Sequence, residues 1–319
     1  MRFKTALDSG AMRSTLLSVL VSSIVSLAAC GGSTAGLAPV SVDGGTGSTG
    51  GTGGGVVDPG ASDDAGATGN CSDAAKLVYL VSQENQLWSF DPTRSGRSAY
   101  TKIGTLNCPS SSSPQTMGVD RTGNAWVFYS DGQLYKVDVR NASCRSAGYA
   151  YPGASSLGFL LGSGFTALGG DITKEALFLL RDGEGLQRFD TSTLVKTSTG
   201  GLRTTSGELT GGPDGKLFVF DPNNSGRIGE INTTTFAVNF IKTFSASTFQ
   251  NVSAFAFARY AGSFYMFTAG LDASGIFPTS TRTTVYDPVA NTVSLRDADI
   301  GITVVGAGQS VCVPPPTPR

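Results

Sequence analysis

Short apolar runs alternate with turn-forming residues along the chain from about residue 77 onward. The runs are four or five residues long, rich in aromatic and β-branched side chains and bounded by turn formers, which is typical of strands buried on both faces. Five recur, at residues 77–81, 125–129, 176–180, 217–220 and 264–267. No window sustains apolar residues at the i, i+3, i+4 and i+7 spacing of a helix, so the pattern predicts an all-β fold.

A second short strand follows each run, and one Asp or Asn follows each second strand. These strands are expected at residues 87–90, 134–137, 186–189, 228–231 and 283–286, and the residues after them are Asp91, Asp138, Asp190, Asn232 and Asp287. The five are spaced by 47, 52, 42 and 55 residues. An Asx side chain can accept a hydrogen bond from the backbone two residues on, so we expect each to end its strand and begin a turn.

The repeating unit has four strands. A short apolar segment precedes most first strands, as at 117–119, 209–210 and 255–257, and an outer strand is expected after the second, as at 101–106, 194–199 and 238–244. Four strands repeated with a period near 49 residues are the anatomy of a β-propeller. We expect five blades; six is the alternative, with the sixth concealed in residues 148–164 or 269–281.

The two ends of the repeat fit ring closure. The first unit begins directly at Leu77 without a preceding segment, and the last apolar stretch, residues 302–305, stands alone. A propeller closes when a strand from one terminus completes the blade at the other. We therefore expect this C-terminal strand to be the inner strand of the first blade, which would bring Cys71 and Cys312 side by side.

The N-terminal residues have the pattern of an export signal. A basic segment begins at Met12, and residues 16–27 are apolar apart from serines. An apolar stretch of about 12 residues is too short to span a bilayer, which needs about 20 helical residues, so we interpret residues 1–29 as a signal peptide. Residues 1–11 are not needed for such a signal, and we expect translation to start at Met12.

The residues Leu27, Ala28, Ala29 and Cys30 resemble the lipobox of bacterial lipoproteins. The resemblance implies cleavage between Ala29 and Cys30 and lipid attachment to the Cys30 thiol, with enough acyl chains for permanent membrane anchoring. Gly31 in place of an Asp favours the outer membrane. Residues 30–70 contain 14 Gly, four Asp and no aromatic or basic residue, a composition that predicts a disordered tether.

Setting Cys30 aside leaves four cysteines, an even number in an exported protein, with three pairings open by count alone. Ring closure favours a Cys71–Cys312 disulfide. We expect Cys108 to pair with Cys144, the two lying on outer strands of neighbouring blades. The propeller is then expected at residues 71–313, followed by a Pro-rich tail at 314–319.

One repeat carries a more specific motif. Asp120, Gly123, Asn124 and Trp126 follow the spacing D-x-x-G-N-x-W. This motif resembles the blades of NHL-type and related bacterial β-propellers. The resemblance covers about residues 75–310 and implies an architecture rather than an activity.

The composition limits the kinds of binding and catalytic site that the chain can carry. The chain of 319 residues has only 15% charged residues, a net charge of −1 and no His. The lack of a basic block argues against nucleic-acid binding, and the lack of His excludes Ser-His-Asp and Cys-His nucleophiles and HExxH metal sites. Catalysis would have to use carboxylates, Lys, Tyr or a metal held by carboxylates.

A membrane-anchored binding or scaffolding module is the function we expect, with a protein or glycan ligand, no cofactor and a monomeric state. The alternative is an enzyme. Regucalcin-like lactonases have a similar fold and bind a divalent cation in the channel, which implies a metal-dependent hydrolase or lactonase with calcium as the first cation to consider. Asp120, Glu208 and Asp214 lie near the expected inner strands or their turns, although turn chemistry also accounts for the two Asp residues.

Overall fold

The computed structural model describes residues 71–154, 160–202, 207–223 and 225–316. The expected signal peptide and tether, with Ala29 and Cys30, lie outside these residues. Within them, twenty strands form five four-stranded antiparallel sheets. The protein is a five-bladed β-propeller, as the repeat predicts.

From centre to rim, blade 1 consists of β20 (Val304–Gln309), β1 (Val78–Ser82), β2 (Gln86–Phe90) and β3 (Tyr100–Thr105). Blade 2 consists of β4 (Pro114–Val119), β5 (Asn124–Tyr129), β6 (Gln133–Asp138) and β7 (Cys144–Ala150). Blade 3 consists of β8 (Leu161–Leu168), β9 (Asp171–Arg181), β10 (Gly185–Asp190) and β11 (Val195–Gly200). Blade 4 consists of β12 (Glu208–Thr210), β13 (Leu217–Asp221), β14 (Arg227–Ile231) and β15 (Val238–Thr243). Blade 5 consists of β16 (Ala254–Tyr260), β17 (Ser263–Ala269), β18 (Arg282–Asp287) and β19 (Thr292–Asp297).

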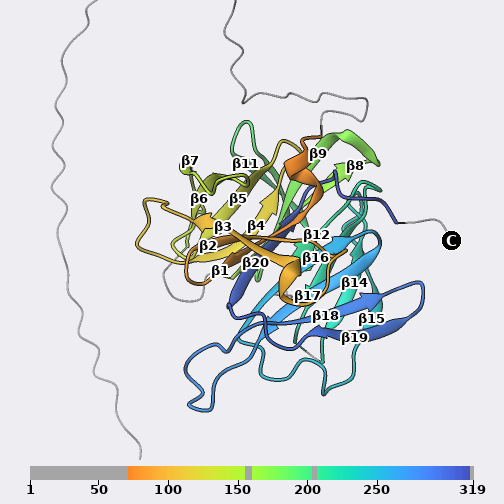
Figure 1. Ribbon diagram of the computed structural model, residues 1–319. Coiled ribbons are helices and arrows are strands. Elements are labelled where there is room, and N and C mark those ends of the chain that lie inside the picture. The colour runs from red at the N-terminus through yellow and green to blue at the C-terminus, as the bar shows by residue number, and fades with distance from the viewer. Residues whose placement is uncertain (1–70, 155–159, 203–206, 224, 317–319) are drawn as a thin grey trace, which may run out of the picture. The chain divides into compact units, whose positions relative to one another are not determined.

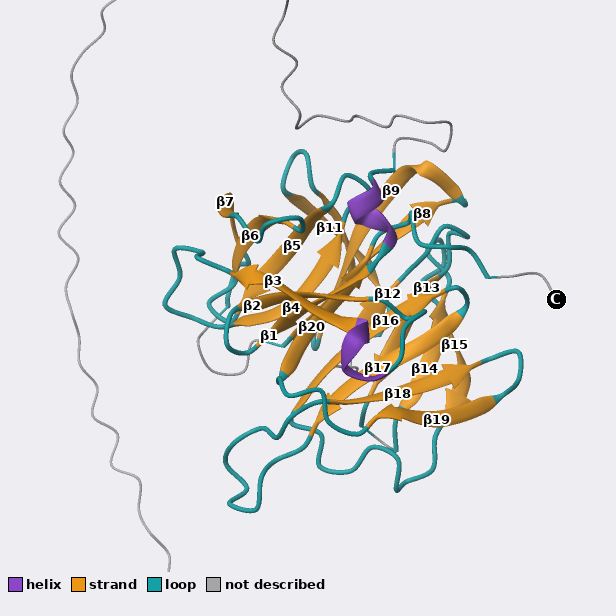
Figure 2. Cartoon of the chain, in the orientation of Figure 1, coloured by secondary structure: helices purple, strands orange, loops and turns teal. Residues whose placement is uncertain are grey.

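The inner strands form a ring around a central channel. β20 contacts β4, β4 contacts β8, β8 contacts β12, β12 contacts β16, and β16 returns to β20. Figure 1 shows β4, β12, β16 and β20 near the middle and β7, β15 and β19 at the rim, and Figure 2 shows how strands dominate the regular structure. Residues 148–164 hold the end of β7 and the start of β8, and 269–281 form a connection with an isolated bridge, so the described chain has no sixth blade.

Glycine lets the inner strands approach each other closely. A Cβ atom added to Gly162 on β8 would lie 2.0 Å from the carbonyl oxygen of Gly207, and one added to Gly211 would lie 2.2 Å from that of Phe165. No side chain fits in these gaps, so the backbones of blades 3 and 4 touch. The inner strands therefore surround the axis of the propeller closely, and we call this axial region the channel.

The hydrophobic core lies between the blades. Each seam between neighbouring blades holds its own cluster of buried side chains in the described chain. At one seam, Phe257 and Phe264 of blade 5 stack with ring centroids 5.6 Å apart, and Phe218 of blade 4 meets Phe264 edge-on at 4.9 Å. The second strand of each blade is a continuous apolar run because neighbouring blades cover both of its faces.

Blade 1 is completed by the C-terminal strand, as ring closure predicts. β20 pairs antiparallel with β1, and its first residue, Val304, lies opposite Ser82. The strand begins at Val304 rather than at the expected residue 302. The reason is that the carbonyl groups of Ile302 and Thr303 accept hydrogen bonds from backbone N–H groups in neighbouring connections.

Two disulfide bonds join the cysteines in the expected pairs. The Cα atoms are 5.8 Å apart in Cys71–Cys312 and 5.2 Å apart in Cys108–Cys144. Cys144 begins the outer strand β7, but Cys108 lies after β3, in the connection from blade 1 to blade 2. The expected position of Cys108 on an outer strand is wrong because β3 ends at Thr105, where its partner strand β2 begins.

Two single-turn 3-10 helices, η1 (Asp73–Lys76) and η2 (Gly96–Ala99), are the helical elements of the described chain. The sequence pattern does not predict them, because four residues are too few to show a helical period. Neither helix is long and apolar enough to cross a membrane.

Candidate functional site

The five repeated Asx residues are turn residues. Each Oδ1 accepts a hydrogen bond from the backbone N–H two residues on, at 2.9, 2.9, 2.8, 2.9 and 2.8 Å for Asp91, Asp138, Asp190, Asn232 and Asp287. This is the turn chemistry that their place in the repeat predicts. The hydrogen bond from Ser192 Oγ, followed by those from nearby backbone N–H groups, lowers the pKa of Asp190 to about 2. These five side chains therefore stabilise the turns that follow the third strand of each blade.

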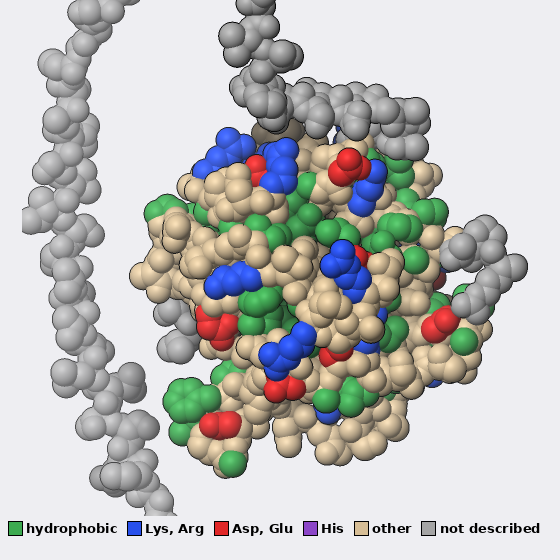
Figure 3. Space-filling model, in the orientation of Figure 1, with side chains coloured by type: hydrophobic (Ala, Val, Ile, Leu, Met, Phe, Trp, Pro, Cys, Tyr) green, Lys and Arg blue, Asp and Glu red, His purple; other side chains and the backbone are tan. Residues whose placement is uncertain are grey.

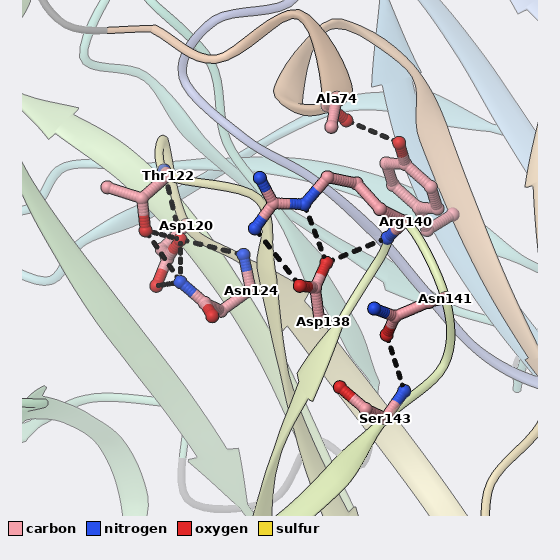
Figure 4. Close-up of polar contacts among 9 residues, drawn as sticks. Ala74, Asp120, Thr122, Asn124, Asp138, Arg140, Asn141 and Ser143 are labelled. Atoms are coloured by element: carbon pink, nitrogen blue, oxygen red, sulfur yellow. Dashed lines mark hydrogen bonds and ion pairs between the residues drawn. The ribbon is translucent and has the colours of Figure 1, made fainter. Parts of the chain in front are cut away.

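The D-x-x-G-N-x-W motif of blade 2 forms its own hydrogen-bond network. Asp120 Oδ1 accepts bonds from the backbone N–H groups of Thr122 at 3.0 Å and Asn124 at 2.9 Å, as Figure 4 shows. Asp120 Oδ2 accepts a bond from Trp126 Nε1 at 3.0 Å. The carboxylate therefore stabilises the turn between β4 and β5 and holds Trp126 in place.

The three candidate cation ligands are not brought together. Asp120 is occupied by its own turn, and Asp214 forms an ion pair with Arg259 Nη1 at 2.9 Å. Glu208 lies on β12, at the channel. Among the residues that the structure describes, no three His, Cys, Asp or Glu side chains are grouped to hold a metal. These three carboxylates do not form a shared cation site.

Glu208 joins three blades at the floor of the channel mouth. Thr116 Oγ1 on β4 donates to Glu208 Oε2 at 2.8 Å, and the Ser163 N–H on β8 donates to Thr116 Oγ1 at 3.1 Å. Only 4% of Glu208 is exposed, and this burial raises the pKa of its carboxyl well above the usual range. Burial in this way favours the neutral form of the carboxyl.

A cavity of about 230 Å³ adjoins Glu208. It is lined at the beginnings of the inner strands of all five blades, by Gln115 on β4, Leu161 on β8, Glu208 on β12, Phe255 on β16 and Val305 on β20. Residues from five different parts of the sequence meet here because the inner strands all start at the same end of the channel. We call this cavity the channel-mouth pocket.

The channel-mouth pocket combines apolar walls with uncharged polar groups. Leu180 and Pro278 add to the apolar wall, and Leu160 at the rim is 54% exposed. Apart from Glu208, the polar side chains are amides and hydroxyls, from Gln83, Ser113, Gln115 and Ser253. No Lys or Arg of the described chain lines the pocket.

Gln115 is placed in the pocket wall by a β-bulge. Pro114 pairs with Tyr129 and Thr116 with Phe128, so Gln115 is an extra residue in the pairing of β4 with β5. A bulge re-aims a side chain relative to the regular strand. The Oε1 atom of Gln115 is buried and accepts no hydrogen bond from the described residues. A buried amide oxygen without a partner is costly, and a molecule in the cavity cannot relieve this cost because the atom has almost no surface accessible to water.

The start of the described chain lies at the opposite end of the channel from the pocket. β20 begins at the pocket and ends at Gln309, close in sequence to Cys312, whose disulfide fixes Cys71 at that far end. In Figure 1 the orange η1, next to Cys71, lies at the top. The blue connection between β17 and β18, whose Pro278 lines the pocket, lies at the lower left. Cys71, the first residue that the structure describes, therefore lies at the end of the propeller away from the pocket.

Sequence reasoning singled out Glu208 but missed Gln115, Thr116 and Ser163. These residues sit near the beginnings of inner strands, where the blades share no common sequence pattern. Pro114 is the one local signal, because proline within a strand often marks a bulge or an interruption of pairing.

Comparison with known proteins shows no family: no family model and no curated protein matches the chain. Among solved structures, a chain of a nidogen/laminin complex is 7% identical, with 73% of this chain and 97% of that chain covered and a TM-score of 0.45. A structural genomics protein of unknown function from Bacteroides thetaiotaomicron is 13% identical, with 70% and 60% covered and a TM-score of 0.43. The extracellular domain of a proposed one-component system from that species is 13% identical, with 72% and 29% covered and a TM-score of 0.37.

These likenesses are distant. The chain spans less than two thirds of the length of the two Bacteroides proteins. The propeller assignment therefore rests on the sheet order described above, and the NHL-type resemblance stays a prediction.

Two further properties bear on where the protein works. Its two disulfide bonds are typical of a protein exported to an oxidising compartment. On the face shown in Figure 3, Lys and Arg are interspersed with Asp and Glu. A mixed distribution of this kind produces no long-range field of one sign on that face.

Proposed function

We propose that the protein is an exported lipoprotein of the bacterial cell envelope, anchored in the outer membrane through Cys30, whose propeller binds a ligand in the channel-mouth pocket. The lipobox at residues 27–30 and the Gly-rich segment at 30–70 support the anchor and the tether. The observation that carries the binding role is the convergence of five inner strands on one cavity that combines an apolar wall with uncharged polar side chains. The protein works as a monomer without a cofactor.

The fold suits this role because it holds the pocket rigidly. The walls come from paired strands, and Thr116 and Glu208 hydrogen-bond across the floor at 2.8 Å. A pocket that is formed before the ligand arrives loses little conformational entropy on binding. Since the chain before Cys71 joins the opposite end of the channel, an anchored propeller would present its pocket away from that attachment.

The binding role is tested by filling the pocket. Ala254 lines it, so Ala254→Phe should place a ring in the cavity. We expect the full chain to bind members of a mixed library of peptides, glycans and small fragments in ligand-observed NMR, and the variant to lose those signals. Ala290→Phe, in the exposed turn between β18 and β19, is the matched control. Equal signals from wild type and Ala254→Phe would contradict the proposal.

The anchor is tested separately. Cells expressing the wild-type chain should incorporate an alkyne fatty acid into the protein, and Cys30→Ser should abolish this labelling and release the protein from membranes. Labelling that survives Cys30→Ser would rule out Cys30 as the lipid site while leaving the pocket experiment unaffected.

A further inference from the structure

We propose that a second cavity, on the outer strands of blade 2, binds a phosphate group. The cavity has a volume of about 440 Å³ and is lined by Asn124, Lys136, Asp138, Ser143, Cys144 and Arg145. Because β6 and β7 are the two outermost strands of the blade, this site lies outside the channel and is separate from the channel-mouth pocket. We call it the rim cavity.

Two cations lie side by side on the strands that line the rim cavity. Lys136 on β6 is paired directly with Arg145 on β7. Directly opposite residues share a face of the sheet with Cβ atoms about 5 Å apart, and like charges in such a pair repel each other. No ion pair of the described residues includes either side chain. An anion bound between them would replace this repulsion with two attractive contacts.

The Lys136 ammonium group is held in position by an aromatic ring. Trp126 on β5 lies opposite Lys136, and Lys136 Nζ lies 4.9 Å from the ring centroid. The ring is itself fixed by the hydrogen bond from Trp126 Nε1 to Asp120 Oδ2 at 3.0 Å. Lys136 is half-buried, whereas Arg145 is exposed. A positioned ammonium loses little side-chain entropy on binding, and the exposed guanidinium can turn toward the ligand.

The one carboxylate among the lining residues, Asp138, is already paired. Arg140 donates from Nε to Asp138 Oδ1 at 2.9 Å and from Nη2 to Asp138 Oδ2 at 3.0 Å, as Figure 4 shows. The backbone N–H of Arg140 also donates to Oδ1, at 2.9 Å. The charge of Asp138 is therefore offset by Arg140, and the charges of Lys136 and Arg145 remain without compensation.

Two adjacent cations favour an oxyanion with two charges. A phosphate monoester carries a charge of about −1.5 to −2 at neutral pH and three acceptor oxygens. The guanidinium of Arg145 can donate two parallel hydrogen bonds to two of these oxygens, and Lys136 can donate to the third. A carboxylate has one charge and would leave one cation uncompensated. The cavity is larger than a phosphate and leaves room for the group that carries it.

Such a phosphate has two sources, a soluble phosphate monoester and a lipid headgroup. The rim cavity is close to the first described residues, because Asn124 directly follows Gly123, where an added Cβ would lie 3.1 Å from Ser72 Oγ. In a chain anchored through Cys30, lipid headgroups are the abundant phosphates. A soluble monoester would need no anchor, so the experiment has a separate arm for each source.

The first arm measures the binding of inorganic phosphate. The full chain carrying Cys30→Ser, in which no acyl chain can be attached at that position, is titrated with phosphate and with acetate in a calorimeter. We expect saturable phosphate binding that raises the temperature of thermal unfolding, with acetate at least about tenfold weaker.

Variants locate the phosphate. Lys136→Gln and Arg145→Gln should each weaken phosphate binding by about tenfold, because each removes one charged donor. Lys102→Gln is the matched control, since Lys102 lies opposite Trp88 on blade 1 as Lys136 lies opposite Trp126. This control removes the same charge and should bind as the parent chain does.

The second arm identifies the source. The same chains are sedimented with phosphatidylcholine vesicles that contain or lack phosphatidic acid, whose headgroup is a phosphate monoester. Sedimentation that requires phosphatidic acid and is lost in Arg145→Gln would support the proposal with a lipid source. Binding of inorganic phosphate without sedimentation would support it with a soluble source.

Three results would overturn the inference. The first is no binding of phosphate or of phosphatidic acid vesicles. The second is equal binding by the parent chain, Lys136→Gln and Arg145→Gln, or an equal loss in Lys102→Gln, which would reveal a general effect of charge. The third is a preference for acetate, which would exclude phosphate as the ligand class. None of them affects the channel-mouth pocket, which Ala254→Phe tests independently.

Discussion

The two ends of the channel differ in how their polar groups are paired. One end carries the Cys71–Cys312 disulfide, and the other is the channel mouth. At the disulfide end, covalent and hydrogen bonds tie distant parts of the chain together, as in the bond from Ser310 Oγ to the Ala75 carbonyl at 2.7 Å. At the mouth, Gln115 Oε1 is buried without a partner among the described residues, and apolar side chains line an open cavity. The contrast indicates that the residues that close the ring and the residues that would bind a ligand in the channel-mouth pocket lie at opposite ends of the channel. Substitutions at the first end should change stability, and those at the second should change binding.

The largest expected effect comes from removing the disulfide that closes the ring. It spans 241 residues, for which the chain-entropy relation gives about 5 kcal/mol. The Cys71→Ser/Cys312→Ser double variant should therefore lose about that much free energy of unfolding in guanidinium denaturation. The matched control is Cys108→Ser/Cys144→Ser, whose disulfide spans 36 residues and is worth about 4 kcal/mol on the same relation. A larger loss in the control would contradict the special role of ring closure.

A second effect at the same end depends on pH. Glu175 accepts the backbone N–H of Arg121 at 3.0 Å, and burial raises the pKa of its carboxyl to about 7 from its ordinary value of 4.5. Its neutral form is the one that the fold favours, so its contribution is complete below pH 4.5 and is lost as the pH rises toward 7. Glu175→Gln should be more stable than wild type by up to about 3 kcal/mol at pH 8, with no difference at pH 4.

Urea denaturation at pH 4, 6 and 8 measures this dependence. The exposed Glu84, substituted as Glu84→Gln, is the control and should follow the wild-type curve. A constant difference between Glu175→Gln and wild type at all three pH values would show that the carboxyl does not titrate in this range.

A smaller effect is expected at the floor of the channel mouth, where Thr116 bonds Glu208. Thr116→Val keeps the shape of the side chain but removes the hydroxyl that bonds Glu208 and Ser163. Two buried polar groups would each lose a partner, which should cost about 2 kcal/mol of unfolding free energy. Thr101→Val on the exposed part of β3 should cost nothing measurable by thermal or chemical denaturation. Equal costs would show that the floor network adds no stability.

The smallest effect on stability is expected at the mouth. Gln115→Leu removes a buried acceptor that has no partner among the described residues, so the free energy of unfolding should stay the same or rise by up to about 1 kcal/mol. Calorimetric unfolding of the ligand-free protein measures this change. A clear loss of stability would mean that Gln115 serves the fold, and the contrast between the two ends would fail.

The parts of the fold that repeat could be predicted because their signals are local. Residues 217–220 read as a buried strand from their own composition, and β13 spans Leu217–Asp221. The position of Asp190 directly after an apolar strand predicts a turn, and its side chain accepts the expected hydrogen bond from the backbone N–H of Ser192. Ring closure followed from an unpaired strand at one terminus and a missing strand at the other.

The pocket could not be predicted in the same way, because it is built from residues that share no local pattern. Thr116 and Glu208 are 92 positions apart and meet only because β4 and β12 start at the same end of the channel. Gln115 points into the pocket through a bulge, which depends on the pairing of β4 with β5. Cys108 was expected on a strand for a related reason: where an outer strand ends is set by its partner rather than by its own sequence.

The strand β20 is the last strand along the described chain, yet it is the innermost strand of the first blade. An exported chain that crosses the membrane from its N-terminus delivers β1 early and β20 late. Until then blade 1 is a three-stranded sheet whose inner edge is open, and open edges invite pairing with other chains. The propeller can therefore finish folding only after β20 has crossed the membrane. The Cys71–Cys312 disulfide can form only after that step, and it then holds the ring closed.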